Sequence, residues 1–69
     1  MKLREAIAVV LTNGLSVEYS GWHLYRTKEK PPRYILLNFN EKGHLMLERE
    51  QSFQDMNEAI EQFVGKTGL

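Results

Sequence analysis

The sequence lacks cysteine, has only two prolines, and holds no apolar run close to the length of a membrane span. Without cysteine, neither a disulfide nor a thiolate zinc site can form, which is what we expect of a protein in a reducing compartment. A membrane-spanning helix needs about 20 apolar residues, so we predict no membrane association. The apolar stretch 6–11 is too short for a signal peptide, and we therefore predict a cytoplasmic protein.

Signatures of catalysis and cofactor binding are also missing. The five glycines stand singly at predicted turns and ends, so there is no glycine-rich phosphate loop. His23 and His44 have no carboxylates around them at the spacing of metal ligands. Ser16, Ser20 and Ser52 lie near predicted turns and caps, where serine usually bonds to nearby backbone. We predict that the chain is not an enzyme and uses no metal, no cofactor and no small-molecule substrate.

Charge is segregated along the chain, although nine basic and nine acidic residues cancel. The segment 26–33 is a basic loop that contains two adjacent prolines, and the last third, around residues 48–61, is acidic. A local field of this kind can select a partner even when the net charge is zero.

A chain of 69 residues predicts one domain, residues 1–69, with a modest core. Leu3, Ile7 and Leu11 recur at helical spacing and predict a helix over about residues 2–13, which Asn13-Gly14 ends. A second helix is expected to begin near Asp55, because Asp55 and Glu58 form a capping-box-like pair.

Period-two patterns between these helices predict strands. A two-residue turn at Ser20-Gly21 would pair Tyr19 with Trp22 and Val17 with Leu24, which puts apolar side chains on one face. A third strand is expected at 34–39.

A bulged turn with Gly43 in the left-handed conformation would follow the third strand. This turn predicts that Phe39 pairs with Leu45 and that Leu37 pairs with Leu47. The fourth strand is therefore expected to include residues 45–47.

The predicted fold class is α+β, an antiparallel meander of three to four strands with an N-terminal and a C-terminal helix packed on one face. The order is α-β-β-β-β-α, or α-β-β-β-α if Leu15–Tyr19 is irregular. The side chains expected to face the helices are Trp22, Leu24, Ile35, Leu37, Phe39, Leu45 and Leu47.

Alternation then assigns Tyr25, Tyr34, Leu36 and Met46 to the opposite sheet face. Three interpretations of that face stay open: cover by a helix, contact with a protein partner or a second copy, and stacking of nucleic-acid bases. We favour a small accessory binding module that uses these four residues to contact a protein partner or to form a homodimer.

The alternative partner is a nucleic acid. Arg26, Lys28, Lys30 and Arg33 in the basic loop would contact phosphates, and Tyr25 and Tyr34 would stack on bases. The same loop is more typical of a solvated hairpin connection, which would bind nothing.

The α-β-β-β-α order is similar to that of double-stranded RNA-binding domains, in which a lysine cluster at the start of the last helix holds phosphates. The matching stretch of this chain, residues 54–58, is acidic. The segment 22–64 also resembles the arm-binding domains of tyrosine integrases in the spacing of Phe53, Glu58 and Ala59, a spacing that a capping box behind an aromatic also produces. We assign the chain to no family from its sequence.

Overall fold

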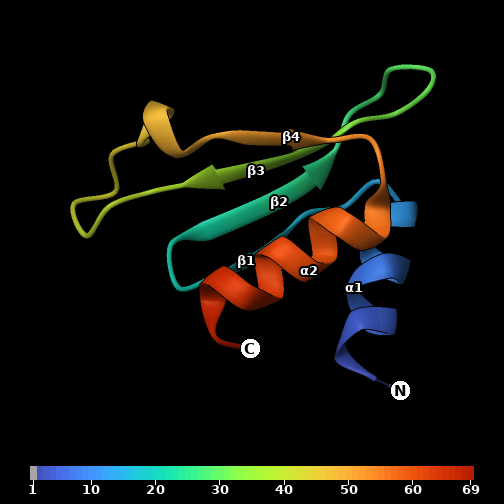
Figure 1. Ribbon diagram of the computed structural model, residues 1–69, viewed down its shortest axis with the longest axis horizontal. Coiled ribbons are helices and arrows are strands. Elements are labelled where there is room, and N and C mark those ends of the chain that lie inside the picture. The colour runs from blue at the N-terminus through green and yellow to red at the C-terminus, as the bar shows by residue number, and fades with distance from the viewer. Residues whose placement is uncertain (1) are drawn as a thin grey trace.

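The computed structural model describes residues 2–69 and has the predicted α+β architecture. In chain order the elements are α1 (Leu3–Thr12), β1 (Val17–Tyr19), β2 (Trp22–Arg26), β3 (Tyr34–Asn38), the 3₁₀ turn η1 (Leu47–Arg49), β4 (Gln51–Phe53) and α2 (Met56–Thr67). The strands form one open antiparallel sheet in the order β1-β2-β3-β4, and both helices lie on the same side of it (Figure 1). The segment 15–19 therefore does contribute a strand, and the meander has four strands.

Local sequence ends α1 as predicted. Gly14 adopts a left-handed conformation with φ +79°. Its N–H donates to the Leu11 carbonyl at 3.0 Å, and the Leu15 N–H donates to the Val10 carbonyl at 3.1 Å. These two bonds satisfy carbonyls that the end of a helix would otherwise leave without donors.

The turn between β1 and β2 is also confirmed. Ser20 and Gly21 both have positive φ, 53° and 83°, as a two-residue hairpin turn that matches the strand twist requires. The register pairs Tyr19 with Trp22.

The core lies between the sheet and the two helices. Its buried apolar side chains are Ile7, Leu11, Leu24, Tyr34, Leu36, Ala59, Ile60 and Phe63. Because buried residues alternate with half-buried ones along β3, Tyr34, Leu36 and Asn38 face the helices. The prediction that Ile35 and Leu37 face the helices is wrong; these two side chains lie on the open side.

The fourth strand begins later than predicted. The pair Phe39 and Leu45 forms as an isolated bridge, and Gly43 is left-handed with φ +80°. The pairing of Leu37 with Leu47 does not form, since Leu47 begins η1 and is exposed. The chain rejoins the sheet only at β4, where Phe53 lies opposite Tyr34.

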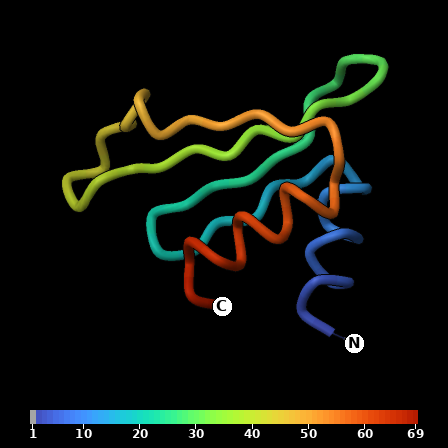
Figure 2. The backbone as a smooth tube through the Cα atoms, viewed as in Figure 1, coloured from blue at the N-terminus to red at the C-terminus, as the bar shows by residue number. Residues whose placement is uncertain are grey.

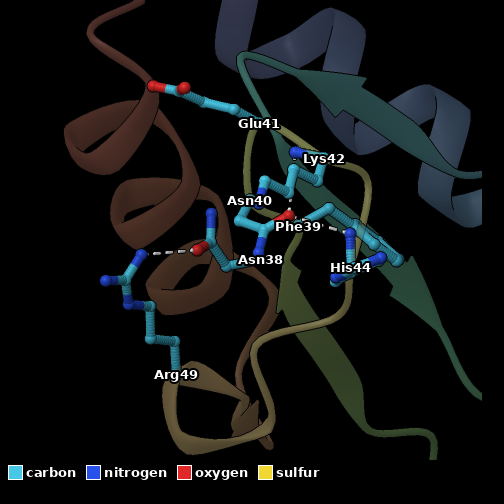
Figure 3. Close-up of a pocket in the computed structure, with 7 residues that line it drawn as sticks. All are labelled: Asn38, Phe39, Asn40, Glu41, Lys42, His44 and Arg49. Atoms are coloured by element: carbon cyan, nitrogen blue, oxygen red, sulfur yellow. Dashed lines mark hydrogen bonds between the residues drawn. The ribbon is translucent and has the colours of Figure 1, made fainter.

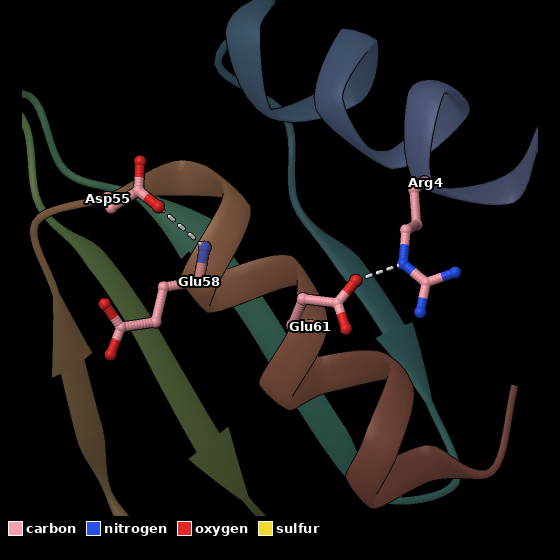
Figure 4. A network of polar contacts seen from close by, with 4 residues as sticks. All are labelled: Arg4, Asp55, Glu58 and Glu61. Atoms are coloured by element: carbon pink, nitrogen blue, oxygen red, sulfur yellow. Dashed lines mark hydrogen bonds and ion pairs between the residues drawn. The ribbon is translucent and has the colours of Figure 1, made fainter.

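Polar contacts support the helical layer (Figure 4). Asp55 is the N-cap of α2 and accepts a hydrogen bond from the backbone N–H of Glu58 at 3.0 Å, as its sequence position predicts. Arg4 of α1 forms an ion pair with Glu61 of α2. Both side chains are more than half exposed, so this pair adds little stability.

Two loops extend from opposite ends of the sheet (Figure 2). Residues 27–33 join β2 to β3 at one end, and residues 39–46 lead away from β3 at the other. Neither helix described in residues 2–69 combines the length and the apolar character needed to cross a membrane.

Candidate binding surface on the open sheet face

The sheet face opposite the helices carries four half-buried side chains that form one block. His23 and Tyr25 project from β2, and their partners across the ladder, Leu37 and Ile35, project from β3. Residues that lie opposite each other in antiparallel strands share a face and have adjacent side chains. We call His23, Tyr25, Ile35 and Leu37 the open-face quartet.

The two ring side chains of the quartet contact each other edge to face. The centroids of His23 and Tyr25 lie 6.1 Å apart and their planes make an angle of 70°. This arrangement places the positive edge of one ring toward the negative face of the other, which is the favourable geometry for such pairs. The rings therefore present a fixed surface beside the aliphatic side chains of β3.

Polar side chains border the quartet on both lateral sides. On the β1 side, the Glu18 carboxylate lies 3.5 Å from Nδ1 of His23. On the β4 side, Ser52 lies opposite Ile35 and its hydroxyl accepts a hydrogen bond from the guanidinium of Arg33. An apolar centre with a polar rim is the usual anatomy of a protein interface.

Three of the four predicted partner-binding residues are not on this surface, and two of these three are buried in the core. Tyr34 is 8% exposed and Leu36 is completely buried, both in the core beneath the helices. The cause is the register between β2 and β3, which places Leu24 opposite Leu36 and therefore on the same face. Tyr25 does lie on the open face, where the sequence places it.

Met46 lies outside the strands altogether. It precedes η1, is half-buried, and its sulfur lies 3.6 Å from Nδ2 of Asn40. Its backbone N–H donates to the Asn38 carbonyl at 2.8 Å. Met46 thus belongs to the turn that follows β3 rather than to a sheet face.

The four basic-loop residues do not act as one cluster. Arg26 is half-buried and donates to the Thr12 carbonyl at 3.0 Å, at the end of α1. Arg33 bonds to Ser52 on the open side of the sheet. Lys28 and Lys30 are exposed, and within residues 2–69 neither forms an ion pair.

The loop itself is held closed at its base. The Thr27 N–H donates to the Arg33 carbonyl at 2.8 Å, and the Arg33 N–H donates to the Thr27 hydroxyl at 2.9 Å. These bonds continue the register of β2 and β3 into the loop. They hold Lys28 and Lys30 at the end of the sheet, beyond the open-face quartet.

A cavity of about 580 Å³ lies at the other end of the sheet (Figure 3). Its polar groups bond to one another: Arg49 donates to the Asn38 side-chain oxygen at 2.9 Å, and Asn38 donates to the Gly21 carbonyl at 3.2 Å. The Asn40 oxygen accepts from the N–H groups of Lys42 and His44, each at 2.9 Å. These hydrogen bonds stabilise two turns at this end of the sheet.

Sequence reasoning missed Ile35 and Leu37 as surface residues and Asn38 as a buried one. The signal that could have identified them is the length of the β2–β3 connection. Whether the connection has an odd or an even number of residues decides which β3 residues share a face with Leu24. Tyr34 to Phe39 is apolar on both alternating faces apart from Asn38, so the pattern alone did not separate them.

The part of the chain that the structure describes brings no set of metal ligands together. Within residues 2–69, no three histidine, aspartate or glutamate side chains cluster as the ligands of a metal ion do. No family model, no curated protein and no solved structure matches this chain. The features of the molecule that bear on its function are therefore the open sheet face and the cavities beside it.

Proposed function

We propose that this chain is a non-catalytic binding module that associates with a second copy of itself through the open-face quartet. The observation that carries the proposal is the quartet: four half-buried apolar and ring side chains on a sheet face against which no helix of residues 2–69 packs. Contiguous apolar surface bordered by polar groups is a usual mark of an interaction site.

A second sheet is a suitable occupant for such a face. Two antiparallel sheets stack face to face at about 10 Å with their inner side chains interdigitated. A chain of 69 residues also has a small core, and binding of a partner to the folded state adds to its stability. Ile35, Leu37 and Tyr25 would be the central anchors of this interface, because aromatic and apolar anchors dominate most interfaces.

Sedimentation velocity over a range of protein concentrations tests this proposal. We expect the wild-type chain to sediment as a dimer at high concentration and the Leu37→Asp variant to sediment as a monomer. The matched control is Leu47→Asp, since Leu47 is 69% exposed in η1 and lies outside the quartet. A wild-type chain that stays monomeric up to millimolar concentration, or equal effects of the two variants, would refute self-association.

A second candidate function is nucleic-acid binding, and one observation favours it. Tyr25 lies on the open face at the end of β2, close in sequence to the exposed cations Lys28 and Lys30. An aromatic ring beside exposed cations is the combination with which proteins bind single-stranded nucleic acids. Tyr34 no longer contributes to this candidate, because it is buried.

Titration of the labelled protein with short DNA and RNA strands tests this candidate by NMR. We expect amide shifts on β2 and residues 27–33 that weaken as salt rises. The double variant Lys28→Glu with Lys30→Glu should abolish them, whereas Glu58→Gln on the helical layer should not. If the double variant shows the same amide shifts as the wild-type chain, these lysines do not bind nucleic acid and the candidate is refuted.

A further inference from the structure

A second cavity, of about 610 Å³, lies where β1 stops short of the end of β2. The loop 14–16 forms one wall, and the end of β2 with the start of the basic loop forms the other. The polar residues that line it are Ser16, His23, Tyr25, Arg26, Thr27 and Lys28. This volume is in the range of small-molecule sites.

The chemistry of the lining is cationic and rich in donors. Arg26 and Lys28 contribute cationic side chains, and Ser16, Tyr25 and Thr27 add hydroxyl groups. Among residues 2–69, no carboxylate lines the cavity, although the Glu18 carboxylate lies 3.5 Å from Nδ1 of the lining residue His23. A site with this composition attracts an anion.

Arg26 is the residue that most needs a partner. Its guanidinium has five N–H donors, of which one bonds to the Thr12 carbonyl. Its Nε is buried without a hydrogen-bond partner, and no carboxylate of residues 2–69 pairs with this half-buried cation. A ligand cannot reach the buried Nε, so the donors that remain for one are the N–H groups of the terminal guanidinium nitrogens.

The cavity beside Asn38 shows that a basic lining alone does not make an anion site. That cavity also has an arginine and a lysine, but Glu41 lines it and Arg49 is bonded to the Asn38 oxygen. The positive charge there is already accompanied by acceptors of the chain itself. Among residues 2–69, the only acceptor that Arg26 bonds to is the Thr12 carbonyl.

We infer that the cavity at Arg26 binds a phosphate group. Phosphate offers several acceptor oxygens on one small anion, which suits the planar fork of Arg26 and the point charge of Lys28. Tyr25 also lines the cavity, and in the monomer its ring would contact an aromatic group attached to the phosphate. This inference rests on the second candidate function, in which Arg26 and Lys28 contact phosphate, and it assigns that contact to one cavity.

The experiment is an amide-resolved NMR titration at constant ionic strength with three probes: inorganic phosphate, phenyl phosphate, and a short oligonucleotide without terminal phosphates. Sodium chloride is the reference for unspecific screening. We expect saturable shifts confined to residues 14–16 and 23–28. Stronger binding of phenyl phosphate would identify a small phosphate monoester as the ligand, and stronger binding of the oligonucleotide would identify a nucleic-acid backbone.

Two lysine variants supply the decisive comparison. Lys28→Gln removes a cation that lines the cavity, and we expect it to weaken phosphate binding roughly fivefold, as loss of an exposed ion pair does. Lys30→Gln removes an equally exposed cation of the same loop that does not line the cavity, so affinity should stay unchanged. Equal loss in both variants, or shifts scattered over the surface, would overturn the phosphate site. Both lysines are exposed, so neither variant should impair folding.

Discussion

Leu24 of β2 lies directly opposite Leu36 of β3, and both side chains are completely buried against the helical layer. This one pairing decides which side of β3 belongs to the core. Because side chains alternate along a strand, Leu36 in the core requires Ile35 and Leu37 on the open face. The candidate interface of the protein is thus a consequence of the β2–β3 register.

Truncation of adjacent β3 residues tests this assignment. Leu36→Ala should lower the free energy of unfolding by about 2–5 kcal/mol, because it leaves a cavity in the core. Leu37→Ala should lower it by about 1 kcal/mol or less, since its side chain is half-buried on the open face. Urea denaturation of the two variants measures the difference. A larger loss of stability for Leu37→Ala would show that Leu37, and not Leu36, faces the core.

Gly21 should tolerate a side chain less well than Gly43. Both have positive φ, so Ala at either position carries a backbone penalty of about 1–2 kcal/mol. A Cβ at Gly21 would also lie 2.8 Å from the Phe39 carbonyl oxygen, whereas a Cβ at Gly43 meets nothing within 4 Å. We therefore expect Gly21→Ala to lower the thermal midpoint clearly more than Gly43→Ala, and similar midpoints would disprove the crowding.

Asn38 should be more important to stability than its partner Arg49. Asn38 is 5% exposed and links the Gly21 carbonyl to the Arg49 guanidinium. Asn38→Leu keeps the number of side-chain heavy atoms but removes the donor to the Gly21 carbonyl and the acceptor for Arg49, and we expect a loss of about 1–3 kcal/mol.

The control for Asn38 is Arg49→Ala, which removes an exposed residue and lets water reach the Asn38 oxygen. We expect a smaller loss there. A double-mutant cycle measured by denaturation gives the coupling between the two side chains, and a coupling of zero would show that their hydrogen bond contributes nothing.

The N-cap of α2 gives a further prediction. Asp55→Ala removes the acceptor for the Glu58 N–H and should lower stability by about 0.5–2 kcal/mol. Asn57→Ala, in the exposed first turn of the same helix, should have almost no effect. Amide hydrogen exchange at the start of α2 would report the loss locally, and unchanged protection in Asp55→Ala would rule out the capping role.

Local features of this fold were predictable because their causes lie within a few residues of the chain. The left-handed Gly14 ends α1, Ser20-Gly21 forms the β1–β2 turn, and Asp55 begins α2. Each depends on backbone conformations or hydrogen bonds that neighbouring residues make. Both helices were predictable for the same reason, since apolar residues recur at helical spacing along one face of each.

The position of β4 was not predictable from local pattern. The Phe39–Leu45 bridge continues the hairpin that the turn at Gly43 starts, yet the ladder stops there. The chain then forms η1, whose Arg49 bonds to the buried side chain of Asn38. A contact between residues eleven positions apart thus displaces the strand to Gln51–Phe53.

The sequence by itself determined the helices, the tight turns, the register of the first hairpin and the α+β class, because these follow from local conformational preference and hydrophobic period. Only the tertiary structure decided which face of β3 is buried. Both faces of that strand are apolar, so alternation could not separate them, and the register with β2 made the choice. As a result Tyr34 and Leu36 lie in the core, and Ile35 and Leu37 lie with Tyr25 on the open face. The shortness of β1 leaves Arg26 beside an open cavity.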